Sequence, residues 1–85
     1  MLQIQYAPSF VRLYSKLSEH LKGEVKEKIK AFQDLTNHKS LKVHKLKGIP
    51  NTYSFSVNYK IRIVFEYQDK KSASLLYVGN HDEVY

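Results

Sequence analysis

Hydrophobic residues alternate with polar ones at the start of the chain, where glutamines separate Leu2, Ile4 and Tyr6. This period of two predicts a short strand with one buried face. From residue 8 to residue 35 the apolar spacing becomes that of a helix, in two successive stripes. The stripes consist of Phe10, Leu13, Tyr14 and Leu17, then of Leu21, Val25, Ile29 and Phe32, with Leu35 near the end. They predict a helical hairpin that covers one face of a sheet.

Residues typical of helix ends flank both stripes. Pro8 suits the first turn of the first helix, and Ser9 is expected to cap it because a serine hydroxyl accepts a backbone N–H there. Ser18 is expected to begin the second helix, and Asn37 to mark its end.

Residues 38 to 52 show only a short apolar pattern and predict mostly loop. From residue 53 the period returns to two. In this segment Tyr53, Phe55 and Val57 lie opposite Ser54 and Ser56, and then Ile61, Ile63, Phe65 and Tyr67 lie opposite Lys60, Arg62, Val64 and Glu66. A turn is expected from Gln68 to Ser72. The apolar run from Leu75 to Val78 predicts a last strand, which the turn-forming pair Gly79-Asn80 stops.

These elements predict an α+β fold: an N-terminal strand, a helical hairpin and an antiparallel three-stranded meander (β-α-α-β-β-β), with the helices packed on one face of the sheet. The 85 residues are expected to form one domain, residues 1–85. A hydrophobic content of 42% favours a folded domain over disorder. The chain has no cysteine, no signal segment and no apolar run near the roughly 20 residues of a membrane helix, so a cytoplasmic protein is expected.

The positive charge is concentrated in one part of the chain. The formal net charge is +6, and no acidic residue occurs between Asp34 and Glu66. This window contains Lys39, Lys42, Lys45, Lys47, Lys60 and Arg62. A stretch of one sign favours a polyanion as partner, either nucleic acid or an acidic protein. A solvated lysine-rich loop is the alternative interpretation.

Groups able to transfer protons follow the last predicted strand. His81, Asp82, Glu83 and the terminal Tyr85 come directly after Gly79-Asn80. A loop rooted in a sheet is a rigid mount for reactive groups, although a plain polar tail is the alternative. The alternating pattern places Arg62 on the open face of a central strand, near the loop that carries His81. An arginine there indicates an anionic partner, with a surface salt bridge to Glu66 as the alternative.

Three stretches, taken in this order, resemble a known family. They are Leu41-Lys42-Val43-His44-Lys45-Leu46-Lys47-Gly48, Tyr59-Lys60-Ile61-Arg62-Ile63-Val64-Phe65-Glu66 and Val78-Gly79-Asn80-His81-Asp82-Glu83-Val84-Tyr85. The whole chain resembles the RelE/ParE superfamily of bacterial toxin–antitoxin toxins, and more particularly its RelE and YafQ side. The resemblance implies a compact ribonuclease that cuts messenger RNA in the ribosomal A site and is held inactive by a cognate antitoxin.

The resemblance also implies roles for individual residues. Arg62 falls where the family places an arginine on the scissile phosphate, and His81 where members carry an arginine or a histidine for acid–base work. Tyr85 occupies an aromatic position near the C-terminus, and His44 matches a histidine of YafQ-like members. Two lysines of RelE correspond here to Ser54 and Ser56, which favours a histidine-based mechanism over a lysine-based one.

These groups suit metal-independent RNA cleavage by the 2′-hydroxyl. The reaction needs a base, an acid and positive charge on the phosphate. Histidine, with an ordinary pKa of about 6.5, can transfer either proton, and arginine can bind the phosphate oxygens bidentately. Stacking on a base is the favoured role of Tyr85, whereas His44 is either a base or a structural, hydrogen-bonded histidine.

Binding to RNA is assigned to Lys42, Lys45, Lys47 and Lys60, and His20 and His38 are assigned to the surface. Neither a metal nor a cofactor is expected, because the histidines lack helical i, i+4 spacing and Asp82-Glu83 alone is too little to hold a cation. The expected partners are messenger RNA, the ribosome and an antitoxin with an acidic segment, in a hetero-oligomeric complex. The alternatives are a ParE-type toxin that inhibits DNA gyrase without nuclease activity, and an inactive basic module that only binds RNA or an antitoxin.

Overall fold

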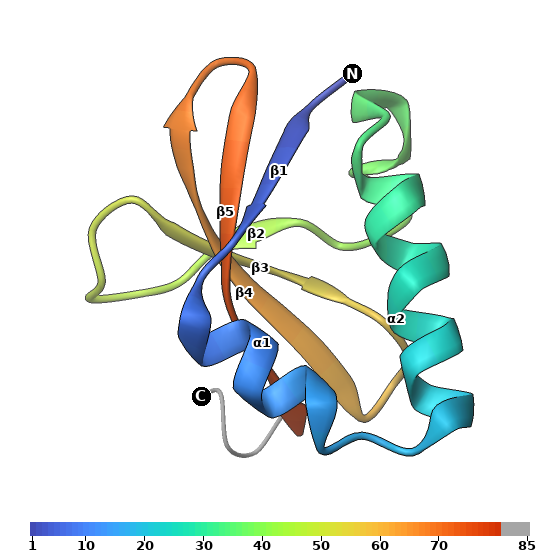
Figure 1. The fold of residues 1–85 in the computed structure, drawn as a ribbon. Coiled ribbons are helices and arrows are strands. Elements are labelled where there is room, and N and C mark those ends of the chain that lie inside the picture. Colours follow the sequence, from blue (N-terminus) through green and yellow to red (C-terminus); the bar gives the residue numbers. More distant parts are fainter. Residues whose placement is uncertain (81–85) are drawn as a thin grey trace.

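The computed structural model describes residues 1–80, and residues 81–85 lie outside the described part. In chain order the elements are β1 (Gln3–Tyr6), α1 (Pro8–Ser15), α2 (Glu19–Phe32), the 3-10 helix η1 (Leu35–Asn37), β2 (His44–Lys45), β3 (Thr52–Ser56), β4 (Ile61–Asp69) and β5 (Ser72–Asn80) (Figure 1). The strands form one sheet in the order β1-β5-β4-β3-β2. In it β1 runs parallel to β5 and the other pairs are antiparallel. The predicted α+β architecture is confirmed.

The two main helices begin in different ways. The Ser18 hydroxyl accepts a hydrogen bond from the Leu21 amide at 3.2 Å and caps α2, as predicted. The N-cap of α1 is Ala7, without a side-chain cap, so the capping role predicted for Ser9 is wrong. The Ser9 hydroxyl instead donates to the Leu76 carbonyl at 2.6 Å, which ties α1 to β5. Within residues 1–80 no helix is both long and apolar enough to cross a membrane.

The second helix ends at Phe32 rather than at Asn37. Beyond it the Asp34 carboxylate accepts the Thr36 amide at 3.0 Å and starts η1, which contains Asn37. Leu35 is 59% exposed in η1, so it is not part of the buried stripe. The tighter 3-10 turn rotates its side chain away from the sheet.

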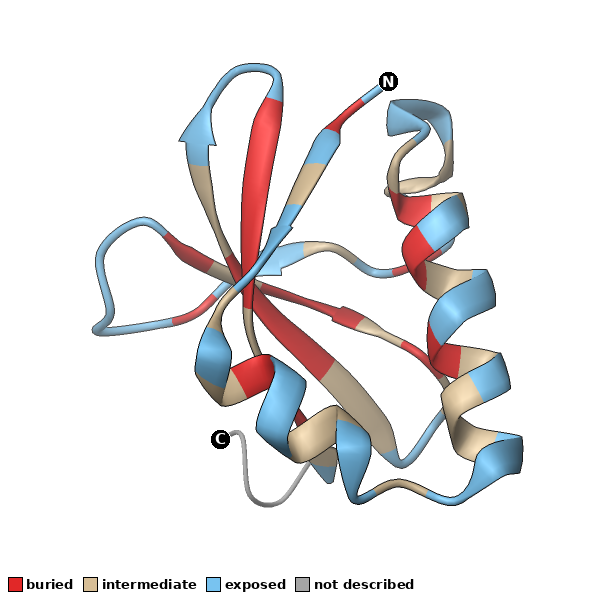
Figure 2. Cartoon of the chain, in the orientation of Figure 1, coloured by how far each residue is buried: buried red, intermediate tan, exposed pale blue. Residues whose placement is uncertain are grey.

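Both helices pack against the same face of the sheet, which we call the helix-covered face. The buried cluster includes Phe10 of α1, Val25, Ile29 and Phe32 of α2, and Phe55, Ile63, Phe65, Leu75 and Val78 of the sheet (Figure 2). The Phe32 ring stacks on Phe55 at a centroid distance of 4.4 Å and meets Phe65 edge-on at 4.6 Å. Burying one such side chain contributes about 1.5–3 kcal/mol, so this face holds the helices on the sheet.

Two of the strand predictions are wrong in their extent. Residues 38 to 52 are not only loop, because His44–Lys45 form the edge strand β2, too short to show an alternating pattern. The pair Gly79-Asn80 is not a turn, because β5 continues through it and pairs with Ile61 and Arg62. The turn between β4 and β5 is also shorter than residues 68 to 72, since β4 reaches Asp69 and β5 begins at Ser72.

An irregularity in β5 decides which of its side chains reach the core. Phe65 pairs with Leu75 and Val64 pairs with Tyr77, so Leu76 is an extra residue opposite the junction of Val64 and Phe65. As a result Leu75 and Val78 both join the core cluster, although three positions separate them. The same shift turns Tyr77 to the opposite face.

Candidate active site

The sheet face opposite the helices carries polar residues in two neighbouring cross-strand rows, and we call it the open face. Directly paired residues on adjacent strands share a face, so the register defines the rows. One row runs His44, Ser54, Val64, Tyr77 across β2, β3, β4 and β5, and the next runs Ser56, Arg62, Gly79 across β3, β4 and β5. Val64 is buried yet is not part of the core cluster, consistent with a place on this face.

Arg62 occupies the middle of the second row, on the central strand β4. Its Nη1 donates a hydrogen bond to the Ser56 hydroxyl at 2.6 Å, which directs the guanidinium toward β3. The side chain is half-buried and its charge is permanent at physiological pH. A half-buried guanidinium with a fixed direction suits a phosphate, whose oxygens match its planar geometry.

His44 stands at the β2 end of the first row. Its Nδ1 lies 2.9 Å from the Lys42 carbonyl, which can only accept, so Nδ1 carries the proton. Its Nε2 lies 3.4 Å from the Ser54 hydroxyl. In the neutral imidazole Nε2 then bears the lone pair, the requirement for a general base. Lys42 adopts a left-handed backbone (φ 58), which is uncommon for a residue other than glycine.

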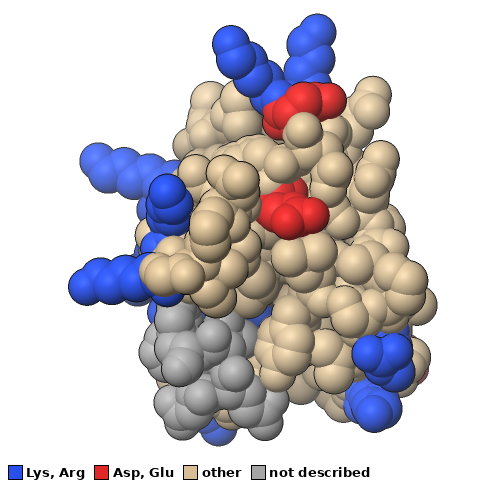
Figure 3. All heavy atoms as spheres, turned by 90° about the vertical axis from the view of Figure 1, so that its left-hand side faces the viewer, with Lys and Arg blue, Asp and Glu red and all other residues tan. Residues whose placement is uncertain are grey.

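The four lysines predicted to bind RNA lie at separate places around the sheet. All four are exposed. Lys45 pairs with Tyr53 and is therefore directed to the face opposite His44. Lys60 lies in the turn between β3 and β4, with its ammonium 5.6 Å from the centroid of the Tyr59 ring. Figure 3 shows basic side chains projecting from one edge of the molecule, with few acidic groups on the face in view.

The prediction for the other two histidines holds only in part. His20 lies on the surface, with its Nε2 3.2 Å from Glu24. His38 packs against the core instead, because its ring stacks on Phe32 at 4.7 Å and its Nε2 lies 2.7 Å from the Phe32 carbonyl. The assignments of His81 and Tyr85 lie outside the described residues, which end at Asn80 beside the row of Arg62.

Tyr77 lies on the open face and was not predicted from the sequence. It is half-buried, and its ring rests on Gly79: a β-carbon at Gly79 would lie 2.7 Å from Tyr77 Cε1. In the sequence Tyr77 lies within the apolar run from Leu75 to Val78, which was interpreted only as a strand. The extra residue Leu76, which turns Tyr77 outward, leaves no signal in that run.

No protein-family model matches the sequence, and no curated protein matches it. Solved structures match it over nearly the whole chain. YafQ from Escherichia coli BL21(DE3) has a TM-score of 0.79 at 12% identity, covering 100% of this chain and 99% of that one. HP0894, described as a conserved hypothetical protein of Helicobacter pylori, has a TM-score of 0.76 at 20% identity, covering 100% of both chains. A chain of the intact E. coli RelBE toxin–antitoxin complex has a TM-score of 0.74 at 18% identity, covering 94% and 96%.

The chain has the RelE/YafQ-like toxin fold. The predicted resemblance is thus confirmed at the level of the fold. Within this fold, Ser54 and Ser56 line the open face where lysines were expected from RelE. Ser54 is fully buried and Ser56 accepts from Arg62, so both serve as partners of the larger polar side chains.

The carboxylates with shifted pKa values lie away from the open face. Hydrogen bonds from the Thr36 side chain and amide lower the pKa of Asp34 below its ordinary value. Hydrogen bonds from the Lys71 amide and the Ser72 side chain lower the pKa of Asp69, which closes the β4–β5 turn. In residues 1–80 no group of three or more metal-ligating side chains is placed to hold a metal ion.

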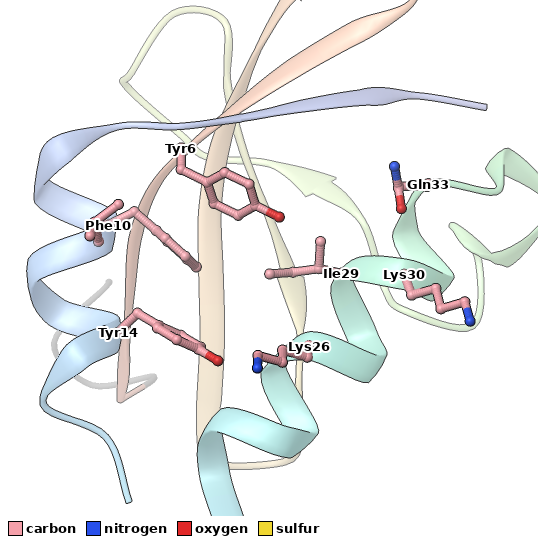
Figure 4. Close-up of a pocket in the computed structure, with 8 residues that line it drawn as sticks. Tyr6, Phe10, Tyr14, Lys26, Ile29, Lys30 and Gln33 are labelled. Carbon is pink, nitrogen blue, oxygen red and sulfur yellow. The ribbon is translucent and has the colours of Figure 1, made fainter. Parts of the chain in front are cut away.

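A groove on the helix-covered side of the RelE/YafQ-like fold lies apart from this site. It has a volume of about 470 Å³ and separates α1 from α2. Figure 4 shows the rings of Tyr6, Phe10 and Tyr14 along one wall, facing Ile29 and Lys26 of α2. The rings follow one another at centroid distances of 5.7 and 6.0 Å. The sheet separates this groove from Arg62 and His44, so the groove belongs to a different function from the open face.

Proposed function

We propose that the protein is the toxin of a toxin–antitoxin module and acts as a metal-independent endoribonuclease on messenger RNA in the ribosomal A site, thereby inhibiting translation. The observation that carries this proposal is the placement of Arg62 and His44 in adjacent rows of the open face of a RelE/YafQ-like fold. Strands in a sheet are about 4.8 Å apart, so two strand spacings separate these residues by a distance on the scale of one nucleotide.

The proposed chemistry needs no group beyond the side chains and the RNA. The 2′-hydroxyl attacks the neighbouring phosphorus as a histidine removes its proton, a P–O bond forms, and the bond to the 5′-oxygen breaks. A protonated histidine supplies the proton to that leaving oxygen. The products are a 2′,3′-cyclic phosphate and a 5′-hydroxyl. Arg62 neutralises the phosphate oxygens as charge develops on them.

Two histidines are available for the two proton transfers. Nε2 of His44 suits the base, because its Nδ1–H is committed to the Lys42 carbonyl. His81 is assigned the remaining transfer and Tyr85 the stacking of a base, on the resemblance alone. The exposed lysines follow the phosphate backbone and supply affinity rather than chemistry.

The test is to add the purified chain to ribosomes programmed with a defined messenger and to map cuts by primer extension. Cleavage without added metal, lost in an Arg62→Ala variant that unfolds at the wild-type temperature, is the expected result. Intact messenger with stalled DNA replication and accumulating breaks would identify a gyrase inhibitor of the ParE type instead. Binding of RNA without cutting would identify an inactive binding module.

For the partner we propose an antitoxin that places an acidic, amphipathic helix in the groove between α1 and α2. The groove floor and walls are apolar and aromatic, and Lys26 and Lys30 lie one helical turn apart among the residues that line it. Carboxylates beside an apolar stripe would match both features, the usual mode of a helix in a groove. A further acidic segment would complement the acid-free window from residue 35 to residue 65.

The double substitution Lys26→Glu/Lys30→Glu tests this partner. We expect it to weaken antitoxin binding at least tenfold and to reduce the rise in unfolding temperature caused by saturating antitoxin. Cleavage of messenger by the free toxin should be unchanged, because the groove lies on the other side of the sheet. Unchanged antitoxin affinity would contradict the placement of the helix.

A further inference from the structure

Tyr77 and His44 lie at opposite ends of one row on the open face. Ser54 and Val64 lie between them, so three strand spacings of about 4.8 Å separate the two ends. The Tyr77 ring does not stay in this row. It extends along β5 over Gly79, the residue paired with Arg62. An aromatic ring therefore borders the position of the guanidinium on the β5 side, whereas the guanidinium itself is directed toward Ser56 on β3.

Gly79 is required by this ring and not by the backbone. Its φ lies outside the left-handed region, unlike that of Gly48, so other residues could adopt its conformation. A β-carbon at Gly79 would lie 2.7 Å from Tyr77 Cε1 and 2.8 Å from the Tyr77 hydroxyl. These distances are far below van der Waals contact, so any side chain at residue 79 would displace the ring.

An aromatic ring beside a phosphate-binding cation is the usual arrangement for single-stranded RNA. The cation holds the backbone, and an unpaired base stacks on the ring. The open face provides both parts within adjacent rows. A half-buried tyrosine also suits stacking, because one side of its ring is already packed and little side-chain freedom is lost on binding.

We infer that Tyr77 is a base-stacking residue of the RNA site, and that Gly79 is a positioning residue that keeps the Tyr77 ring beside Arg62. The inference rests on the proposed ribonuclease function and adds a substrate contact to it. The ring stacks a base next to the phosphate that Arg62 holds. It therefore contributes affinity, and a preference for the base, at one nucleotide flanking the cut.

The experiment measures cleavage of ribosome-bound messengers that differ only in the nucleotides on either side of the cut. Tyr77→Phe keeps the ring and should retain cleavage and base preference. Tyr77→Ala should raise the half-saturating toxin concentration about 5- to 150-fold, the range for one base–aromatic stack, with a smaller effect on the maximal rate. Tyr77→Leu, which preserves an apolar contact on the sheet, replaces Tyr77→Ala if that variant does not fold.

Gly79→Ala tests the positioning role, with Gly23→Ala as the matched control. A β-carbon at Gly23 meets nothing within 4 Å, so that variant should cleave like the wild type. Gly79→Ala should raise the half-saturating concentration in the same direction as Tyr77→Ala. In the Tyr77→Ala background it should have little further effect, because no ring remains to be displaced.

The outcomes separate this inference from the function on which it rests. A wild-type chain that does not cut messenger overturns both. An active wild type with Tyr77→Ala unchanged in half-saturating concentration and base preference overturns the stacking role alone. A loss on Gly79→Ala that is equally large without the tyrosine ring overturns the positioning role, because the glycine would then act through the strand itself.

Discussion

The helix-covered face and the open face belong to the same strands but are held together differently. On the first, Phe32, Phe55 and Phe65 have no exposed surface and contact one another through their rings. On the second, Arg62 and His44 are each oriented by hydrogen bonds to single neighbouring groups. Apolar burial is non-directional and tolerates similar shapes, whereas a hydrogen bond needs its partner at one position.

The open face depends on the helix-covered face through the strand register. A slip of one residue in β4 would bring Arg62 into the core and expose its apolar neighbours, so burial of Ile63 and Phe65 fixes where Arg62 points. The reverse dependence is weak, because polar residues at a solvent-facing site contribute little to burial. Substitutions on the two faces should therefore affect stability and activity in opposite proportions.

The largest effect on stability is expected from Phe32→Ala. Removing a ring that contacts Phe55, Phe65 and His38 should cost about 3–5 kcal/mol, a large share of the stability of so small a domain. Chemical denaturation should show a much lower midpoint or no folded baseline, with activity lost in parallel. Phe32→Leu keeps most of the apolar contact and should lose less. A wild-type midpoint for Phe32→Ala would contradict the central place of this ring.

The largest effect on activity is expected from His81→Ala. Loss of one catalytic proton transfer typically lowers the rate about 10²–10⁴-fold, so toxicity should disappear while folding and antitoxin binding persist. His81→Arg separates two roles: activity is partly retained if charge at the phosphate is what counts, and almost none remains if proton transfer is. Growth assays and messenger mapping measure both. Full toxicity of a folded His81→Ala variant would reject the acid–base assignment.

The fold was largely predictable because the helix-covered face is periodic. Apolar stripes and alternation identify each element that packs there, including the cap at Ser18. The open face was less predictable, because its arrangement depends on pairing between strands. β2 has only two residues, and Leu76 shifts the register of β5 without changing composition. The role of Gly79 follows from a ring at Tyr77 that no spacing rule detects.

A smaller effect is expected from the lysines, and it sharpens the distinction between the faces. Lys42→Ala, Lys47→Ala and Lys60→Ala should each weaken binding to ribosome-bound messenger and lower its salt dependence by about one counterion. Lys45 is directed to the face opposite His44, so Lys45→Ala should have less effect than these. Lys16→Ala at the end of α1 is the matched control for loss of one charge. Single-turnover cleavage at saturating toxin should be retained in all four, in contrast to His81→Ala.

The smallest effect is expected where the two faces meet, at the hydrogen bond from Ser9 to the Leu76 carbonyl. Leu76 lies between Leu75, which reaches the core, and Tyr77, which reaches the open face. Ser9→Ala leaves that part-buried carbonyl without its hydroxyl donor and should cost about 0.5–1.5 kcal/mol, a fall of several degrees in the unfolding temperature. Ser9→Thr keeps the donor and should restore most of it. Because the irregularity sets the direction of Tyr77, Ser9→Ala should also raise the half-saturating toxin concentration slightly. An unchanged unfolding temperature would show that strand pairing alone holds Leu76 in place.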